Sequence, residues 1–253
     1  MVPPGINDAG VIPRVLAHYA RCAPLLEAGF AGSPIVFADF PRGLHGAARF
    51  RITHIPFSSA RLGWLVQREY AIEFHTWAPL PGHPERLRFG RILIEPSSNA
   101  GFARVKEAAL AVREHLLTAE LDAIPLVDGI GGIALWLPFS EAPPATRMRS
   151  KLQRLALRAA ATHPRVRIDA ATNAPGRYSP LPYSLRGMPN LPVCSPVEWA
   201  ELEGLRSAIV CSAESFPARI AARGDLFAKA TGELAQQRLY PHARTRARKS
   251  LGG

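Results

Sequence analysis

The chain has 253 residues, of which 47% are hydrophobic; this excludes a disordered chain and suffices for one large domain or two joined lobes. Its formal net charge is +11, and the basic residues are overwhelmingly arginine. Codon usage can explain why arginine outnumbers lysine, but not the net positive charge. Such an excess attracts polyanions, so nucleic acid is the first partner class to consider.

Neither a membrane span nor a disulfide framework is expected. No apolar run approaches the ~20 residues that cross a bilayer, and residues 1–9 lack the layout of a signal peptide. We therefore expect a soluble, cytoplasmic protein without a membrane partner. The three cysteines, Cys22, Cys194 and Cys211, are odd in number and lack metal-ligand spacing, so we expect them to be reduced and structural.

The first 90 residues predict an N-terminal α/β lobe. Apolar spacing over residues 11–26 predicts a helix that ends at Pro24, and residues 34–37 predict a short strand. Residues 62–76 predict a helix that runs into a strand over 71–75.

The middle of the chain predicts an α+β fold. Residues 91–95 form a strand, and Ser97, Ser98 or Asn99 could cap the next helix. The expected elements that follow are a helix around 102–116, strands 123–127 and 133–137 joined by a turn at 128–132, a helix around 148–159 and a strand 165–169. This order is the split βαβ pattern of an antiparallel sheet with helices on one face.

The C-terminal part predicts a proline-rich loop over 175–196, then helices over about 197–207 and 215–237. We expect one domain over 1–237, made of lobes 1–90 and 91–237, followed by a basic tail at 238–253. The tail is either a nucleic-acid arm or a solvated terminus.

Several segments together resemble the polymerase/primase domain of bacterial DNA ligase D, in the archaeo-eukaryotic primase superfamily. They include Asp169-Ala-Ala-Thr-Asn173, Pro182-Tyr-Ser-Leu-Arg186 and Pro196-Val-Glu-Trp199. Segments at 33–43, 63–77 and 217–225 extend the similarity over nearly the whole chain. The resemblance implies the primase-polymerase fold.

The resemblance also implies nucleotidyl transfer with two divalent cations held by three carboxylates. Two come from an Asp-x-Asp pair on the first strand of the split motif, where this chain has Leu93 and Glu95. Leucine cannot ligate a metal, and glutamate places its carboxylate one methylene further out. The third position, Asp169, is retained, so Glu95 and Asp169 are the residual catalytic and metal-binding candidates.

The central turn departs further from the family's Ser-Gly-x-Lys-Gly-x-His. Asp128, Gly131 and Ala134 replace its serine, lysine and histidine. The lost lysine and histidine would bind phosphate, and Asp128 would repel a triphosphate unless a metal intervened. A family lysine that grips a DNA 5′-phosphate aligns with Ile12.

Other matched residues are retained. By resemblance, Arg186, Asn173 and Ser184 are nucleotide- or phosphate-binding candidates, and a guanidinium can meet phosphate with two hydrogen bonds. For Ser184 and the neighbouring Tyr183, bracing of the loop is the favoured role. His75 is expected to be an ordinary strand histidine.

Three hypotheses follow. The first is a member of the family with little or no catalysis, which binds DNA ends, gapped duplex or nucleoside triphosphate in double-strand break repair by non-homologous end joining. The second is an active Mn²⁺- or Mg²⁺-dependent polymerase in which Glu95, Asp128 and Asp169 form a rearranged carboxylate site. The third keeps only the fold, as a protein-interaction part. A separate ligase and end-binding protein are implied partners, and a bacterial, nucleoid-associated location is the implied setting.

Overall fold

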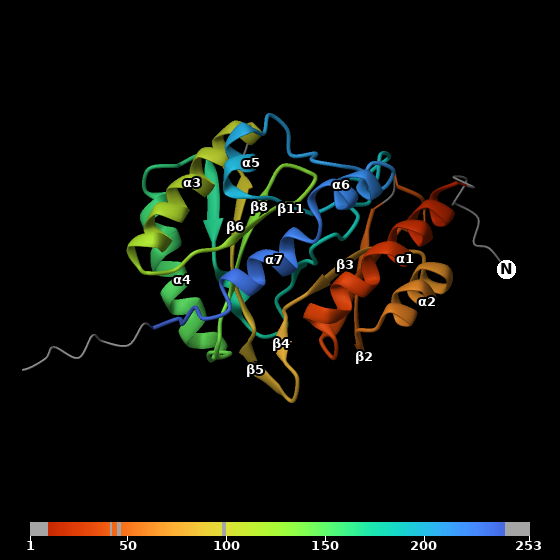
Figure 1. The fold of residues 1–253 in the computed structure, drawn as a ribbon, viewed down its shortest axis with the longest axis horizontal. Helices are drawn as coiled ribbons and strands as arrows, with labels where there is room; N and C mark the ends of the chain where they lie inside the picture. Colours follow the sequence, from red (N-terminus) through yellow and green to blue (C-terminus); the bar gives the residue numbers. More distant parts are fainter. Residues whose placement is uncertain (1–9, 41, 45–46, 98–99, 241–253) are drawn as a thin grey trace, which may run out of the picture.

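A computed structural model describes residues 10–40, 42–44, 47–97 and 100–240, without the side chains of residues 54 and 55. Two sheets stand side by side, each with helices packed on it (Figure 1). The helices are α1 Val11–Phe30, α2 Ser59–Glu69, α3 Phe102–Thr118, α4 Ala145–Ala160, α5 Trp199–Gly204, α6 Phe216–Arg223 and α7 Leu226–Glu233, with the 3-10 turn η1 Ala171–Asn173. The strands are β1 Pro34–Asp39, β2 Arg49–Pro56, β3 Ala71–Thr76, β4 Pro79–Leu80, β5 His83–Leu87, β6 Phe89–Pro96, β7 Ile124–Val127, β8 Ile133–Pro138, β9 Val166–Asp169, β10 Ser179–Pro180 and β11 Ser195–Pro196.

The first sheet has the strand order β10-β3-β1-β2, and α1 and α2 pack beside it. The prediction that α1 ends at Pro24 is wrong, because the helix continues to Phe30. Pro24 removes one backbone donor, but Leu26 and Phe30 extend the buried face of the helix. Tertiary burial therefore outweighs the local preference to stop.

The second sheet has the order β11-β7-β8-β6-β9 and is antiparallel throughout. The order β9-β6-β8-β7 with crossover helices α3 and α4 confirms the predicted split βαβ pattern. Ile92 and Ile94 of β6 face a core shared with α3 and α4. Because side chains alternate along a strand, Leu93 and Glu95 point to the opposite face, toward the first sheet.

Three expected helix boundaries differ from the structure. The N-cap of α3 is Gly101, which makes no side-chain cap bond, so Ser97 does not cap it; residues 98 and 99 lie outside the described ranges. The helix expected over 197–207 is only Trp199–Gly204. The helix expected over 215–237 is two, because Gly224 adopts φ +66° and Asp225 then caps α7 by accepting from Ala228 N at 3.0 Å.

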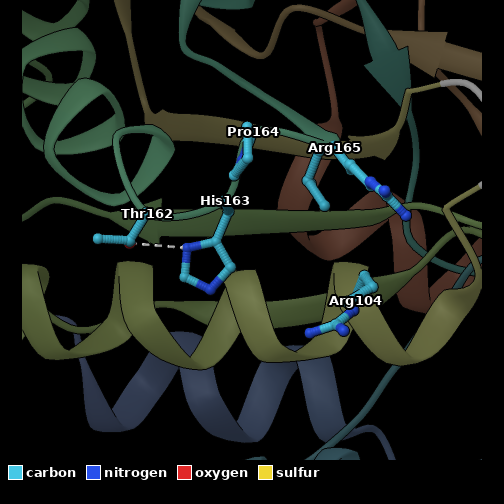
Figure 2. A pocket seen from close by; sticks show the side chains of 6 residues that line it. Arg104, Thr162, His163, Pro164 and Arg165 are labelled. Atoms are coloured by element: carbon cyan, nitrogen blue, oxygen red, sulfur yellow. Dashed lines mark hydrogen bonds between the residues drawn. The ribbon is translucent and has the colours of Figure 1, made fainter.

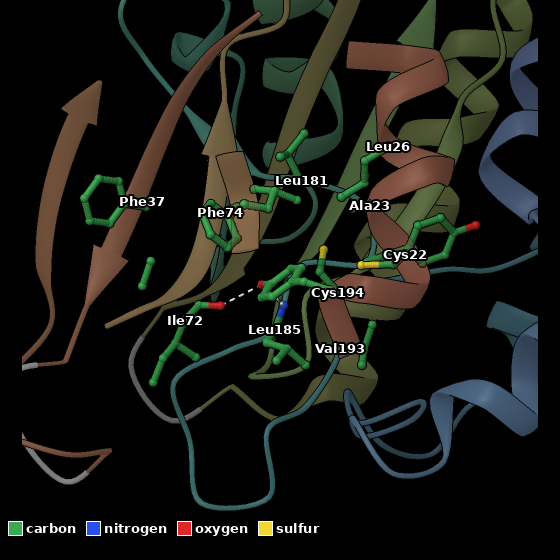
Figure 3. Close-up of a cluster of buried hydrophobic side chains, with 14 of the residues drawn as sticks. Cys22, Ala23, Leu26, Phe37, Ile72, Phe74, Leu181, Leu185, Val193 and Cys194 are labelled. Atoms are coloured by element: carbon green, nitrogen blue, oxygen red, sulfur yellow. Dashed lines mark hydrogen bonds between the residues drawn. The ribbon is translucent and has the colours of Figure 1, made fainter. Parts of the chain in front are cut away.

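The C-terminal part returns to the first sheet. β10 pairs with β3, and Leu181, Leu185 and Val193 pack with Ile72 and Phe74 of that sheet in one apolar core (Figure 3). Cys22, Cys194 and Cys211 are free and buried. The predicted boundary between two lobes at residue 90 stays a prediction. The apolar core of the first sheet contains residues from both sides of it.

The buried Arg91 also links the two sheets. Its guanidinium donates to the carbonyls of Thr76, Trp77 and Thr172 at 2.6–3.2 Å. These acceptors lie at the end of β3, just after it, and in η1, so one side chain of β6 ties the two sheets together. Among the described helices, none is long and apolar enough to cross a membrane.

Candidate functional site

A cleft of about 190 Å³ opens between the two sheets. Leu93, Glu95 and Ala134 line its floor on β6 and β8. The described residues on its other sides are Phe50, His75, Asp128, Gly132, Ile133, Tyr178, Ser179, Pro180, Arg186 and Cys194. Strands and loops from both sheets therefore converge on one opening.

The sequence-predicted positions on the floor lie side by side. Leu93 pairs with Ala134 on one neighbouring strand and with Asp169 on the other. Leu93 is half-buried and packs against the apolar core of the first sheet. The middle of this row is thus apolar.

An arginine that the sequence analysis did not single out lies between the two retained carboxylates. Arg167 pairs directly with Glu95 across β9 and β6, and its guanidinium forms an ion pair with the Glu95 carboxylate. Its Nη1 also lies 4.0 Å from Asp169 Oδ2, while Asp169 Oδ1 accepts a 2.6 Å hydrogen bond from Ala171 N. Both carboxylates therefore already have positively polarised partners.

Asp128 closes the central turn. Its Oδ1 accepts hydrogen bonds from the backbone N–H groups of Ile130, Gly131 and Gly132 at 2.8–2.9 Å. A Cβ at Gly132 would lie 2.7 Å from Asp128 Oδ2 and 3.2 Å from the carbonyl oxygen of Ile94, so a side chain there would push the carboxylate aside. The Asp128 carboxylate thus binds the backbone of its own turn.

Arg186 reaches the cleft from the C-terminal loop but is not a free cation. Its Nε lies 3.4 Å from Oε2 of the buried Glu73. Oε2 also contacts His75 Nε2 at 3.1 Å, and Oε1 accepts from Gly187 N at 2.9 Å. The loop that carries Arg186 is therefore held on the first sheet by one buried carboxylate.

Burial and neighbouring charges together set the protonation of Glu73 and His75. Burial alone would raise the pKa of Glu73, but the hydrogen bond from His75 and the Arg186 guanidinium hold that pKa below its usual value. Burial lowers the pKa of His75 despite the neighbouring carboxylate. His75 is thus neutral near pH 7, with Nε2–H donating to Glu73.

Comparison with known proteins decides the family. The family described as "LigD, primase-polymerase domain" matches residues 53–227, well over half of the chain. The chain belongs to this family.

Solved structures support the same fold. One of them, the polymerase domain of Mycobacterium tuberculosis ligase D in complex with DNA, is 24% identical with a TM-score of 0.76; the match covers 88% of this chain and 92% of that one. A search of curated proteins finds no match.

The LigD polymerase family depends on divalent metal, but the residues present here do not fit a two-metal site. Leu93 offers no ligand, and Arg167 contacts both remaining carboxylates. Across the part of the chain that the structure describes, no group of three or more His, Cys, Asp or Glu is placed to hold a metal. Glu95 and Asp128 share the cleft, but Asp128 Oδ1 is occupied by the turn.

Two family-matched residues have structural partners. Asn173 is fully buried and exchanges hydrogen bonds with the backbone N–H and carbonyl of Arg91 at 2.8 and 2.6 Å. Ser184 is fully buried and accepts from Phe74 N at 2.8 Å. Asn173 thus fixes η1 on β6, and Ser184 fixes the C-terminal loop on β3. Tyr183 ties the same loop to α7 by donating to Asp225, the N-cap of that helix, at 2.6 Å.

Ile12, aligned with the family's phosphate-gripping lysine, is half-buried on α1 against the core of the first sheet.

Arg167 could have been found from the sequence, because it precedes Asp169 by two residues and so shares its strand face. Glu73 bears the same relation to His75. Phe50 and Tyr178, which stack with ring centroids 5.7 Å apart at the cleft, gave no such signal because they meet only in three dimensions.

Proposed function

We propose that this LigD primase-polymerase member binds DNA ends, gapped duplex or nucleoside triphosphate in double-strand break repair by non-homologous end joining, with little or no nucleotidyl transfer. The observation that carries the proposal is Arg167 between Glu95 and Asp169, next to the apolar Leu93. A guanidinium supplies fixed positive charge there, but it cannot coordinate a nucleotide's oxygens and a primer hydroxyl as a metal ion does.

Binding is proposed on what the cleft retains. Arg186 lines it, with a side chain that is 13% exposed. Phe50 and Tyr178 offer aromatic surface on which an unpaired base could stack. The M. tuberculosis neighbour is described in complex with DNA, and this chain carries a net charge of +11. We propose that this chain acts beside a ligase activity and an end-binding protein in the bacterial cytoplasm.

A fill-in assay tests the catalytic half of the proposal. A gapped, 5′-phosphorylated duplex is incubated with labelled nucleotides and either Mn²⁺ or Mg²⁺. We expect no templated extension above that of an Asp169→Ala control, because the wild-type site already lacks its metal-binding geometry.

A specific observation keeps one alternative testable. Glu95 and Asp128 both line the cleft, so a rearranged carboxylate site with Asp169 could support Mn²⁺-dependent synthesis if Arg167 moved aside. Robust extension by the wild-type protein that Asp169→Ala and Asp128→Asn each abolish would establish this alternative and overturn the non-catalytic proposal.

A binding titration tests the other half. Fluorescence anisotropy with open, gapped duplex should show salt-sensitive binding that weakens in Arg186→Gln. Absence of any binding to DNA or nucleotide across the salt series would favour a purely protein-binding role.

A further inference from the structure

The outer face of the second sheet carries a row of cations that the cleft does not use. Arg147, Lys151, Arg154 and Arg158 of α4 are spaced at i, i+4, i+7 and i+11, so they lie on one side of the helix. We call these four side chains the α4 stripe. Three of them are exposed and Lys151 is half-buried. At a rise of ~1.5 Å per residue the stripe extends over roughly 16 Å.

The α4 stripe is not neutralised locally. The sequence of α4 contains no Asp or Glu, and among the described residues no carboxylate lies within ion-pair distance of the four cations. By contrast, the neighbouring helix α3 pairs Arg104 with Glu107 at 2.9 Å. Like charges four apart destabilise a helix by a few tenths of a kcal/mol, so an unpaired row is not what folding alone would select.

Acidic groups near the stripe are few. Glu120 acts on Lys151, whose pKa is lowered first by burial and then by Arg154, with Glu120 opposing. At the start of the helix, a pocket of about 350 Å³ is lined by Arg86, Arg147 and Arg238. Among the described residues that line it, the one acid is Glu141, whose Oε1 lies 3.5 Å from Arg238 Nη2.

The basic tail leaves the described structure beside this stripe. Lys151 Nζ donates to the carbonyl of Leu239 and lies 5.1 Å from the ring centroid of Tyr240. In Figure 1 the segment after α7 runs to α4. Residues 241–253 lie outside the described ranges, but their sequence adds four cations, at 244, 246, 248 and 249.

The stripe and the cleft face opposite sides of one sheet. Met148 and Leu152 of α4 pack on the face of β6 that carries Ile92 and Ile94, whereas Leu93 and Glu95 open to the cleft. A second pocket, of about 320 Å³, lies beyond the end of α4, where Arg104, His163 and Arg165 come together (Figure 2). The outer face is therefore basic at both ends of the helix.

We propose that the α4 stripe is a second DNA-binding surface, which contacts the phosphate backbone of duplex DNA independently of its ends. The choice of DNA as the polyanion rests on the proposed function; the surface itself rests on the charge geometry of α4.

The test separates this surface from the cleft. The ligand is a short duplex closed by hairpin loops at both ends, which offers backbone but no end. Binding is measured by anisotropy over a salt series for wild type and for R147Q/K151Q/R154Q/R158Q, in which glutamine preserves helix propensity. A matched control, R21Q/R42Q/R68Q/R206Q, removes the same charge from exposed arginines elsewhere.

We expect the stripe variant to bind about tenfold more weakly or worse, with a slope of log K against log salt flatter by roughly 2–4, because each lost phosphate contact removes about 0.9. The control should lose much less, since exposed charges beyond a Debye length of ~10 Å are screened. Thermal denaturation verifies that both variants fold.

Equal losses in both variants would reduce the effect to net charge and overturn the proposal, as would unchanged binding in the stripe variant. Stripe-dependent binding to phosphatidylserine vesicles with none to the closed duplex would assign the surface to membranes instead. If open gapped duplex binds no better than closed duplex, the end-binding function fails while the α4 stripe stands.

Discussion

At the scale of single residues, the cleft differs from a two-metal site by the apolar Leu93 and by the position of one cation. Arg167 reaches across from β9 to Glu95 and lies near Asp169. The positive charge of the guanidinium offsets the negative charge of the two carboxylates. A metal ion is then not required between them to balance that charge. The apolar side chain of Leu93 and the positive charge of Arg167 therefore both disfavour a bound metal ion.

This predicts that metal binding can be rebuilt at two positions. The double variant L93D/R167Q restores one carboxylate and removes the competing cation, so it should bind Mn²⁺ at least tenfold more tightly than wild type in a calorimetric or EPR titration. L93D alone should gain less, because Arg167 would still contact the carboxylates. Equal Mn²⁺ affinity in wild type and the double variant would show that Arg167 does not exclude the metal.

At the scale of an element, the β7–β8 turn, in which the resemblance places phosphate-binding side chains, is held by its own carboxylate. Asp128 Oδ1 collects three backbone N–H groups at 2.8–2.9 Å, and Gly129 takes φ +82°. The turn keeps its glycines because the backbone needs them, while the lysine and histidine positions are free to change to Gly131 and Ala134.

We therefore expect Asp128→Ala to lower the free energy of unfolding by about 1–3 kcal/mol, since it leaves backbone donors without their acceptor. Asp128→Asn keeps an oxygen in place and should cost clearly less. Urea denaturation of the three proteins measures the difference. If both variants were as stable as wild type, the turn would not depend on this carboxylate.

At the scale of the whole molecule, helix α1 and the C-terminal loop are joined through a buried histidine. His18 Nε2 lies 2.8 Å from the carbonyl of Tyr183 and donates to it. Burial, aided by Arg21, lowers the pKa of His18 to about 4, although the Tyr183 carbonyl and Glu214 oppose the shift. This histidine is therefore neutral in the folded protein above about pH 4.

The sign of its effect on stability follows. The folded pKa, about 4, lies below the unfolded value of ~6.5, so the unfolded chain binds more protons between these values. Stability should therefore fall as pH drops from about 6.5 to 4, by up to about 3 kcal/mol from His18 alone. His18→Gln keeps a donor for Tyr183 but cannot titrate. Chemical denaturation at several pH values should show a flatter profile for this variant; identical profiles would contradict the assignment.

Local pattern was enough for much of the fold. The alternating pattern of β6 and the apolar spacing of α3 predict which of their faces are buried, because the periods of strand and helix are properties of the backbone itself. The spacing of two residues on one strand likewise predicted that Leu93 and Glu95 share a face of the sheet. The resemblance then identified Asp169 as the third carboxylate position and Ala134 as a replaced histidine, and the strand register places Leu93 beside both.

What the sequence could not decide depends on contacts between distant segments. The continuation of α1 past Pro24 needs the core under Phe30, and the burial of Asn173 and Ser184 needs the backbones of Arg91 and Phe74. By itself the sequence was enough to identify the family and to predict the lost positions Leu93, Gly131 and Ala134. Only the tertiary structure placed Arg167 between Glu95 and Asp169 and turned Asp128 toward its own backbone, because the partner of a charge is set by distance in space rather than by position along the chain.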